Sequence, residues 1–255
     1  MNDISKYLIY IIVLTGLAWL YSGFQMKGMP FVRDIHESLY EEPEQDEASK
    51  ENFTFEYAKK EYVAQPLYDY SINGLVVSNS DISNMLDNYR VGREINLKDL
   101  CIIWGDNLKH RAFRKMKFWN KDSICFYEFG EYKKYEKNFD GSKLSNNHLV
   151  SDRDYLIKKI NRVKAGDQVQ ISGHLVNYFP KGASEKLNES SISRTDSGDS
   201  ASEIIYVERF HIIEPGKQTW STLNSVFKKL FFFLIIVEIG FLFVAFQLKK
   251  ELKKE

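Results

Sequence analysis

Residues Leu230–Leu248 read LFFFLIIVEIGFLFVAFQL, and a second apolar run, Tyr7–Phe24 (YLIYIIVLTGLAWLYSGF), lies near the other end of the chain. A membrane-spanning helix needs about 20 mostly apolar residues, because each helical residue adds 1.5 Å and hydrocarbon cannot satisfy unpaired backbone groups. Both runs therefore predict transmembrane helices. The sequence between them is then attached to the membrane at both of its ends.

The N-terminal run has to be compared with a cleaved signal peptide. A signal peptide has a positive leader and a cleavage site between small residues, whereas the leader MNDISK carries one Lys and one Asp. The small residues Gly16 and Ala18 lie early in the run, and the bulky Trp19, Leu20 and Tyr21 follow them. Aromatic residues are typical of a membrane boundary, so the run is interpreted as a permanent anchor.

The distribution of lysines predicts the orientation, because cytoplasmic flanks of spanning helices retain Lys and Arg. Four lysines follow the second run and two precede it, whereas the flanks of the first run slightly oppose this signal. We expect a multi-pass protein of the cell (inner) membrane with both termini in the cytoplasm and the central domain outside it. The residues are Lys249, Lys250, Lys253 and Lys254 after the second run, Lys228 and Lys229 before it, Lys6 before the first run, and Lys27 and Arg33 after it.

The composition indicates a folded domain between the spans. Hydrophobic residues make up 44% of the 255 residues and aromatic residues 15%, more than a chain that cannot bury a core contains. Lys and Arg (35) balance Asp and Glu (35). No overall field therefore attracts nucleic acid, and any attraction of polyanions has to be local.

The central segment predicts five strands and one helix. The helix, Asp152–Val163, has an apolar face of Tyr155, Leu156, Ile160 and Val163 at helical spacing, and Ser151 with Asp154 resembles a capping box. The strands are rich in β-branched and aromatic residues: Ile72–Ser78, Lys98–Trp104, Ser123–Phe129, Asp167–Tyr178 and Glu203–Ile213. The chain is divided into a cytoplasmic tail (1–6), a first span (7–24), an acidic linker (25–64), the β domain (65–214), a juxtamembrane segment (215–229), a second span (230–248) and a basic tail (249–255).

The order of these elements is that of an OB-fold, a five-stranded, partly open Greek-key barrel. We expect a membrane-anchored, mainly β protein in which two transmembrane helices flank a five-stranded OB-like β-barrel domain with one helix between strands 3 and 4. Another small antiparallel barrel or sandwich is the alternative. Gly173 inside the fourth strand predicts a bulge or a bend of the barrel. Cys101 and Cys125 lie in two predicted strands and either form a disulfide or remain buried thiols.

The segment Lys109–Lys121 (KHRAFRKMKFWNK) combines basic and aromatic side chains. Such segments bind single-stranded nucleic acid or anionic lipid headgroups. An external domain close to a membrane is expected to contact lipid headgroups or an acidic envelope protein and not nucleic acid. The alternative is a hairpin with one apolar and one solvated face. The candidate binding residues are Lys109, Arg111, Arg114, Lys115, Lys117 and Trp119.

The connection Phe179–Ser202 is a second candidate site, because a connection longer than about 15 residues is usually functional or disordered. Its Arg194 and neighbouring hydroxyl groups could hold an anion or a carboxylate. The alternative is a polar loop of local turns. The candidate residues are Ser191, Ser193, Arg194 and Asp196.

The sequence contains no nucleophile elbow, P-loop, HExxH, CxxC pair or kinase signature. We therefore assign no catalytic residues, metal ligands or cofactor, and favour a binding or assembly module over an enzyme. The alternative is a membrane-anchored, hydrolase-like enzyme with a site built from His148, Asp152, Arg194 and Asp196. His174 is expected to face solvent, and His211 to lie in the core.

Glu238 lies in the middle of the second apolar run, where an unpaired charge costs several kcal/mol. It either remains protonated or bonds to another membrane protein or a second copy of the chain, and a transporter or channel subunit is a third possibility that rests on this residue alone. We expect a two-span membrane protein whose external β domain is a binding and assembly module for an envelope partner within a membrane complex.

Reporter fusions test the predicted orientation. A reporter that is active only outside the cytoplasm should be active after Met26, and one active only inside should be active after Glu255. Activity of the inside reporter after Met26 would contradict the prediction and make nucleic acid a candidate for the basic segment.

Overall fold

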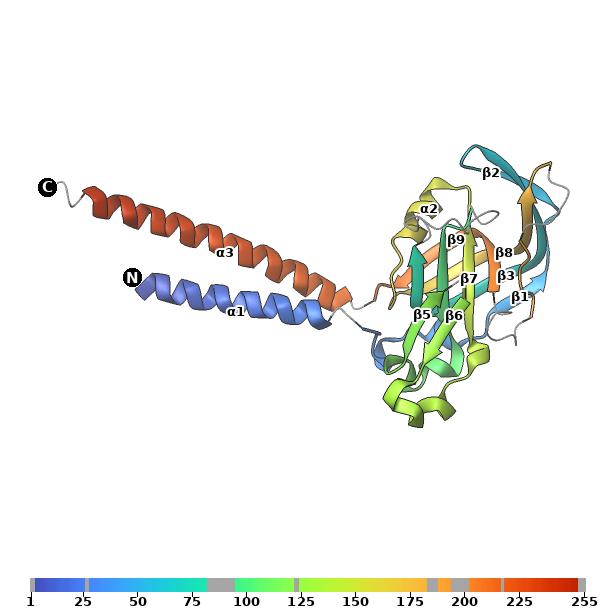
Figure 1. Cartoon of the computed structure of the whole chain (residues 1–255), viewed down its shortest axis with the longest axis horizontal. Coiled ribbons are helices and arrows are strands. Elements are labelled where there is room, and N and C mark those ends of the chain that lie inside the picture. The colour runs from blue at the N-terminus through green and yellow to red at the C-terminus, as the bar shows by residue number, and fades with distance from the viewer. Residues whose placement is uncertain are drawn as a thin grey trace. The chain divides into compact units, whose positions relative to one another are not determined.

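The computed structural model describes residues 3–25, 28–81, 95–121, 124–182, 188–193, 202–216 and 218–251. The chain divides into two compact units (Figure 1). Residues 1–28 and 217–255 form a helical unit, and residues 29–216 form a mostly β domain. Two apolar terminal helices around a central β domain are the coarse architecture that the sequence predicts.

The helical unit consists of α1 (Asp3–Gln25) and α3 (Gln218–Glu251). Each contains a stretch that is long and apolar enough to cross a membrane. They contain the two predicted spans, and α3 also includes most of the predicted juxtamembrane segment.

The two helices pack through aromatic rings and polar groups. The ring of Trp19 lies 5.6 Å from that of Phe231, and a Cβ added at Gly16 would lie 3.0 Å from the same phenylalanine. The amide of Asn224 donates to the Trp19 carbonyl at 2.9 Å and to the Ser22 hydroxyl at 3.1 Å. Small residues and interhelical hydrogen bonds are the usual means by which membrane helices associate.

Seven strands of the β domain belong to one sheet (Figure 1). They pair in the order β1-β3-β4-β7-β9-β8, β2 pairs with β3, and β8 also pairs with β3. The β7–β9 pair is parallel and the others are antiparallel. The strands are β1 (Glu44–Glu47), β2 (Phe53–Tyr57), β3 (Lys60–Asp81), β4 (Lys98–Ile103), β7 (Leu144–Val150), β8 (Gln168–Pro180) and β9 (Ser202–Glu214), and a separate hairpin contains β5 (Lys117–Lys121) and β6 (Ile124–Glu128).

Helix α2 (Asp154–Asn161) covers part of the core. Its Leu156 and Ile160 are buried in one apolar cluster with Ile171, Leu175 and Phe210 of the sheet. Burying an aliphatic or aromatic side chain of this size contributes about 1.5–3 kcal/mol. This cluster holds the helix against the sheet.

The start of α2 differs from its prediction. Its N-cap is Arg153, which makes no side-chain cap bond within the described structure. The Ser151 hydroxyl instead bonds to the Val207 carbonyl and to the Arg153 amide, each at 3.3 Å. Tyr155, predicted to be on the apolar face, is 55% exposed. The predicted capping box is wrong, because the Ser151 hydroxyl donates to a backbone carbonyl of β9.

Four of the five predicted strands correspond to strands of the main sheet, namely β3, β4, β8 and β9. The fifth, Ser123–Phe129, corresponds to β6, which pairs with β5 and not with the main sheet. Its expected place beside β4 is taken by β7. The predicted acidic linker contains β1, β2 and the beginning of β3. The predicted count of five strands is therefore too low.

Strand β7 was not predicted because its middle is polar. Its sequence is LSNNHLV, and all seven residues are buried. Asn147 donates to the Ser145 hydroxyl at 2.8 Å and to the Leu100 carbonyl at 3.3 Å. Asn has low strand propensity, and strand propensity depends strongly on context. Hydrogen bonds within the sheet replace the apolar contacts that prediction relies on.

The pairing of the sheet is irregular beside Gly173, where a bulge was predicted, and the extra residue, Glu208, belongs to β9. The β8–β9 register shifts between Ser172 and Gly173, and a Cβ at Gly173 would lie 2.0 Å from the Tyr206 carbonyl oxygen. No side chain fits at that distance, because backbone atoms of the paired strand cannot move away cheaply. Glycine is therefore required for β8 and β9 to pair.

We expect Gly173→Ala to lower the free energy of unfolding by roughly 1–3 kcal/mol, the range for forced overpacking. Urea unfolding of the full chain in detergent, followed by tryptophan fluorescence, measures the change. Gln170→Ala, at a half-buried position of the same strand, is the control and should cost less than about 1 kcal/mol. Equal losses for the two variants would contradict the interpretation.

Candidate functional site

The chain between β4 and β7, residues 105–143, forms an excursion from the sheet. It contains the β5–β6 hairpin and the short 3-10 helices η4 (Gly105–Leu108), η5 (Arg111–Arg114), η6 (Gly130–Asn138) and η7 (Gly141–Lys143). It carries ten Lys and Arg residues against six Asp and Glu, in a chain of zero net charge. The excursion is therefore the local concentration of positive charge that the sequence predicts.

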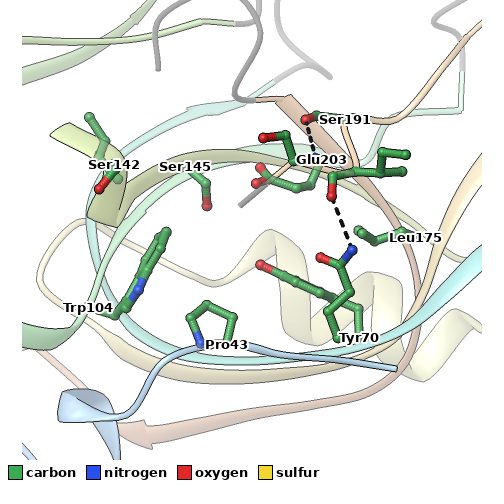
Figure 2. A pocket seen from close by; sticks show the side chains of 12 residues that line it. Pro43, Tyr70, Trp104, Ser142, Ser145, Leu175, Ser191 and Glu203 are labelled. Atoms are coloured by element: carbon green, nitrogen blue, oxygen red, sulfur yellow. Dashed lines mark hydrogen bonds between the residues drawn. The ribbon is translucent and has the colours of Figure 1, made fainter. Parts of the chain in front are cut away.

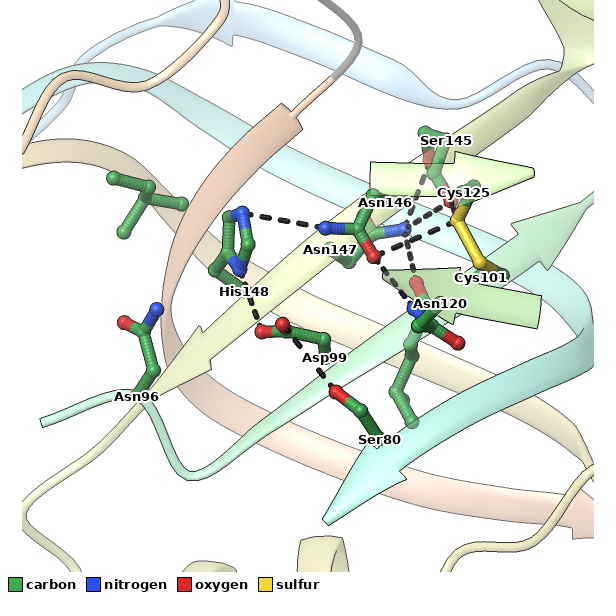
Figure 3. A network of polar contacts seen from close by, with 12 residues as sticks. Ser80, Asn96, Asp99, Cys101, Asn120, Cys125, Ser145, Asn146, Asn147 and His148 are labelled. Atoms are coloured by element: carbon green, nitrogen blue, oxygen red, sulfur yellow. Dashed lines mark hydrogen bonds and ion pairs between the residues drawn. A yellow bond between two sulfur atoms is a disulfide. The ribbon is translucent and has the colours of Figure 1, made fainter. Parts of the chain in front are cut away.

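A disulfide holds the excursion to the sheet. Cys101 of β4 is bonded to Cys125 of β6, and their Cα atoms are 5.7 Å apart (Figure 3). Of the two alternatives for these cysteines, the structure has the disulfide. Phe113 and Phe118 add apolar contacts, since both belong to the cluster that contains Cys101 and Ile103.

The hairpin has one packed face and one exposed face. Phe118 packs inward, whereas Trp119 is 40% exposed and stacks on Phe126 with centroids 5.6 Å apart and an interplanar angle of 11°. Lys117 lies 3.8 Å from Glu128 across the two strands. The exposed face thus presents an aromatic stack beside lysine side chains.

The other predicted basic residues lie just before the hairpin. Lys109 is paired with Asp106 at 2.6 Å. Arg111 and Lys115 are exposed, and Arg114 is partly buried. The Arg114 guanidinium lies over the Phe31 ring, 4.0 Å from its centroid. All six predicted residues therefore lie on one excursion, although Arg114 also packs against the domain.

The second predicted group lies partly at a small cavity (Figure 2). Ser191 and Ser193 line it, together with Tyr70, Trp104 and Glu203. Figure 2 shows Ser191 and Glu203 on one side, facing Trp104, Pro43 and Tyr70 on the other. Arg194 and Asp196 lie outside the described residues.

The cavity is nearly filled. Its volume is about 10 Å³, room for about one water molecule, whereas pockets for small molecules measure about 300–1,000 Å³. The Gln45 amide closes it by donating to the Ile192 carbonyl at 3.1 Å. In this form the cavity accommodates solvent and not a small organic ligand.

His148 belongs to a buried network (Figure 3). Its Nδ1 lies 2.6 Å from Asp99 Oδ1, and its Nε2 lies 3.3 Å from the Asn146 amide nitrogen. Ser80 donates to the other Asp99 oxygen at 3.4 Å, and the Asn120 side-chain amide donates to Asn146 Oδ1 at 3.0 Å. Both ring nitrogens therefore have partners, and the network joins β3, β4, β7 and the hairpin.

Of the residues of the hydrolase-like alternative, the structure describes His148 and Asp152, and each bonds to a different partner. Asp152 accepts a hydrogen bond from the Tyr206 hydroxyl at 2.7 Å, and burial together with Asp152 raises the pKa of Tyr206. His148 is bonded to Asp99 instead. Hydrogen-bonded polar groups between strands specify how the strands pack, although Asn120 Oδ1 and Asn147 Oδ1 are buried without a partner among the described residues.

A polar cleft of about 320 Å³ was not predicted. His174, expected to face solvent, is only 5% exposed. Its Nδ1 lies 2.8 Å from Asp69 and its Nε2 lies 3.4 Å from Glu208. The strand keeps its phase here, since Val169, Ile171 and Leu175 all lie in one core cluster. His174 is buried because Asp69, Glu208 and the Phe53 ring lie against it on the polar side of the strand. His211, expected in the core, is exposed.

Two of the four carboxylates that line the cleft in the described part of the chain, Asp69 and Glu208, have lowered pKa values. Hydrogen bonds from Ser49 and the adjacent His174 lower the pKa of Asp69 below its usual 3.8, although burial opposes them. For Glu208 burial opposes the shift, and Lys50 with His174 lowers the pKa below the usual 4.5. Lys50 Nζ lies 3.0 Å from Glu208. The Lys50–Glu208 ion pair and the contacts of Asp69 with Ser49 and His174 therefore tie the segment after β1 to β3, β8 and β9.

Glu238 has a partner within its own chain. The Ser5 hydroxyl donates to Glu238 Oε1 at 2.5 Å. Ser5 lies in the first turn of α1, where free backbone amides and the helix dipole favour a carboxylate. Glu238 Oε2 is buried without a hydrogen-bond partner among the described residues. Ser5 lies before the predicted first span and was not predicted as a partner of Glu238, and contact with another copy stays a prediction.

The chain was compared with known proteins. No family model, no curated protein and no solved structure matches it.

We expect the ion pairs of the cleft to make stability depend on pH. Carboxylates with lowered pKa values stabilise the fold above their unfolded pKa, and this contribution disappears as pH falls through the folded value. Asp69→Asn should therefore cost about 0.5–1 kcal/mol at neutral pH, the range for partly exposed pairs, and should reduce the loss of stability below about pH 4.

Urea midpoints measured across this range of pH test the expectation. Glu214→Gln removes an exposed carboxylate at the end of β9 and is the control. If Asp69→Asn and wild type lost stability in parallel as the pH fell, the cleft would not be the source of the dependence.

Proposed function

We propose that this chain is a multi-pass protein of the cell (inner) membrane whose central domain lies outside the cytoplasm and acts as a binding and assembly module for an envelope partner. The Cys101–Cys125 disulfide carries the proposal. Disulfides persist in oxidising compartments and are rare in the cytosol. The bond supports the external location that the lysine distribution predicts.

We also infer that the core of the domain is OB-like. Strands β3, β4, β7, β9 and β8 pair in that order, and β8 pairs again with β3. The β7–β9 pair is parallel, and α2 lies between β7 and β8 in the chain. On this interpretation β1 and β2 are additions beside the first strand, and the excursion is an insertion between the second and third strands.

The excursion is the proposed binding surface. Its exposed Trp119 can provide apolar contact area, and the nearby lysines attract an acidic partner. The disulfide and the packing of Phe118 hold this surface in place before the partner arrives, which lowers the entropy lost on binding. Contact with a further membrane protein or a second copy through Glu238 is part of the same proposal.

Thiol trapping in cells tests the location. Cells that express the full chain are treated with N-ethylmaleimide, and the denatured protein is then labelled with maleimide–polyethylene glycol with or without prior reduction. We expect two adducts after reduction and none without it, because the disulfide protects both sulfurs from the first reagent. Two thiols that are free in cells would overturn the proposed location.

Native gels of detergent-solubilised membranes test the binding surface. We expect wild type to migrate as a complex that contains more than the 29.9 kDa chain, and Lys117→Gln/Trp119→Ala/Lys121→Gln to lose most of it. Lys158→Gln/Lys159→Gln, on the exposed side of α2, is the matched control and should keep it. An unchanged complex in the triple variant would contradict the assignment of the surface.

A further inference from the structure

Arginine side chains gather around one exposed aromatic ring. The Phe31 ring is 37% exposed, with the Arg114 guanidinium 4.0 Å and the Arg33 guanidinium 5.2 Å from its centroid. Burial lowers the pKa of the Arg114 guanidinium, and the positive charge of the nearby Arg111 lowers it further. Asp34 offsets part of this charge, since it lies 3.5 Å from Arg33.

This arrangement favours an anion. Two guanidinium groups over one ring repel each other, and a bound negative group would remove that cost. Guanidinium groups bind phosphate through two parallel hydrogen bonds, and an exposed ring between them is suited to the boundary of a membrane. The Arg33 side chain is 82% exposed and therefore accessible to such a group.

The covalent chain keeps the cluster near the membrane. Phe31 follows the last residue of α1, Gln25, by six residues, which can span about 21 Å at most. The Arg114 side chain also bonds to the Met29 carbonyl at 3.4 Å. Met29 packs in the same apolar cluster as Ile213, which precedes α3 by only a few residues. The covalent chain alone sets this upper limit on the distance between Phe31 and the end of α1.

We propose that Phe31, Arg33, Arg111 and Arg114 form a surface that binds the phosphate groups of anionic lipids in the membrane that holds the two helices. This inference rests on the membrane-spanning part of the proposed function and on neither the envelope partner nor the side of the membrane. The surface fixes how the domain lies on the lipid, so that the exposed face of the hairpin is presented in one orientation.

Photo-crosslinking of the full chain in nanodiscs tests the surface. The photoreactive residue p-benzoylphenylalanine replaces Phe31 or, as the control, Tyr155, which is 55% exposed on α2. The nanodiscs contain phosphatidylcholine alone or with phosphatidylglycerol, and mass spectrometry counts the lipid adducts. We expect phosphatidylglycerol adducts at position 31 to exceed those at position 155 by at least about five-fold.

Charge variants separate specific binding from proximity. Arg33→Gln/Arg111→Gln should reduce the phosphatidylglycerol adducts at position 31 several-fold, and so should high salt, because exposed charges are screened. Lys158→Gln/Lys159→Gln should leave them unchanged. Adducts that do not depend on the two arginines or on phosphatidylglycerol, or cross-links at position 31 to protein, would overturn the proposal. If wild type formed no complex on native gels but gave the expected lipid adducts, only the proposed envelope partner would be refuted.

Discussion

Backbone pairing along β3 is the constraint on which the rest of the domain depends. This strand, Lys60–Asp81, pairs with β1, β2, β4 and β8. A single strand can pair with so many others because it bends, and its register shifts near Pro66 against β8 and near Val77 against β4. Every cluster of buried side chains contains residues of this strand. The excursion, the polar cleft and the small cavity are therefore positioned by one element.

The sequence predicts those elements that depend on periodicity or composition. The two spans, the strands within β4, β8 and β9, and the irregular pairing beside Gly173 can all be identified because apolar runs and a misplaced glycine are local signals. The clustering of basic and aromatic residues between Lys109 and Lys121 is also local. These residues lie on one excursion because they are close together in the sequence.

The missed features depend on long-range contacts. The seven buried residues of β7 look like a polar loop until Asn147 and His148 are given partners on neighbouring strands. His174 lies on the polar side of its strand, as the phase predicts, but Asp69, Glu208 and Phe53 from other strands cover it. Ser5 was not recognised as the partner of Glu238 because they are 233 residues apart. In each case the decisive partner comes from a distant segment.

The position of β9 in the chain has a consequence for biosynthesis. This strand pairs with both β7 and β8, and it ends at Glu214, only four residues before α3 begins. The ribosome must therefore synthesise nearly the whole central segment before the sheet can be completed. The unfinished sheet exposes the edges of β7 and β8 until then, and unpaired edges invite aggregation. Completion of the domain and emergence of the second apolar helix are consequently consecutive events in translation.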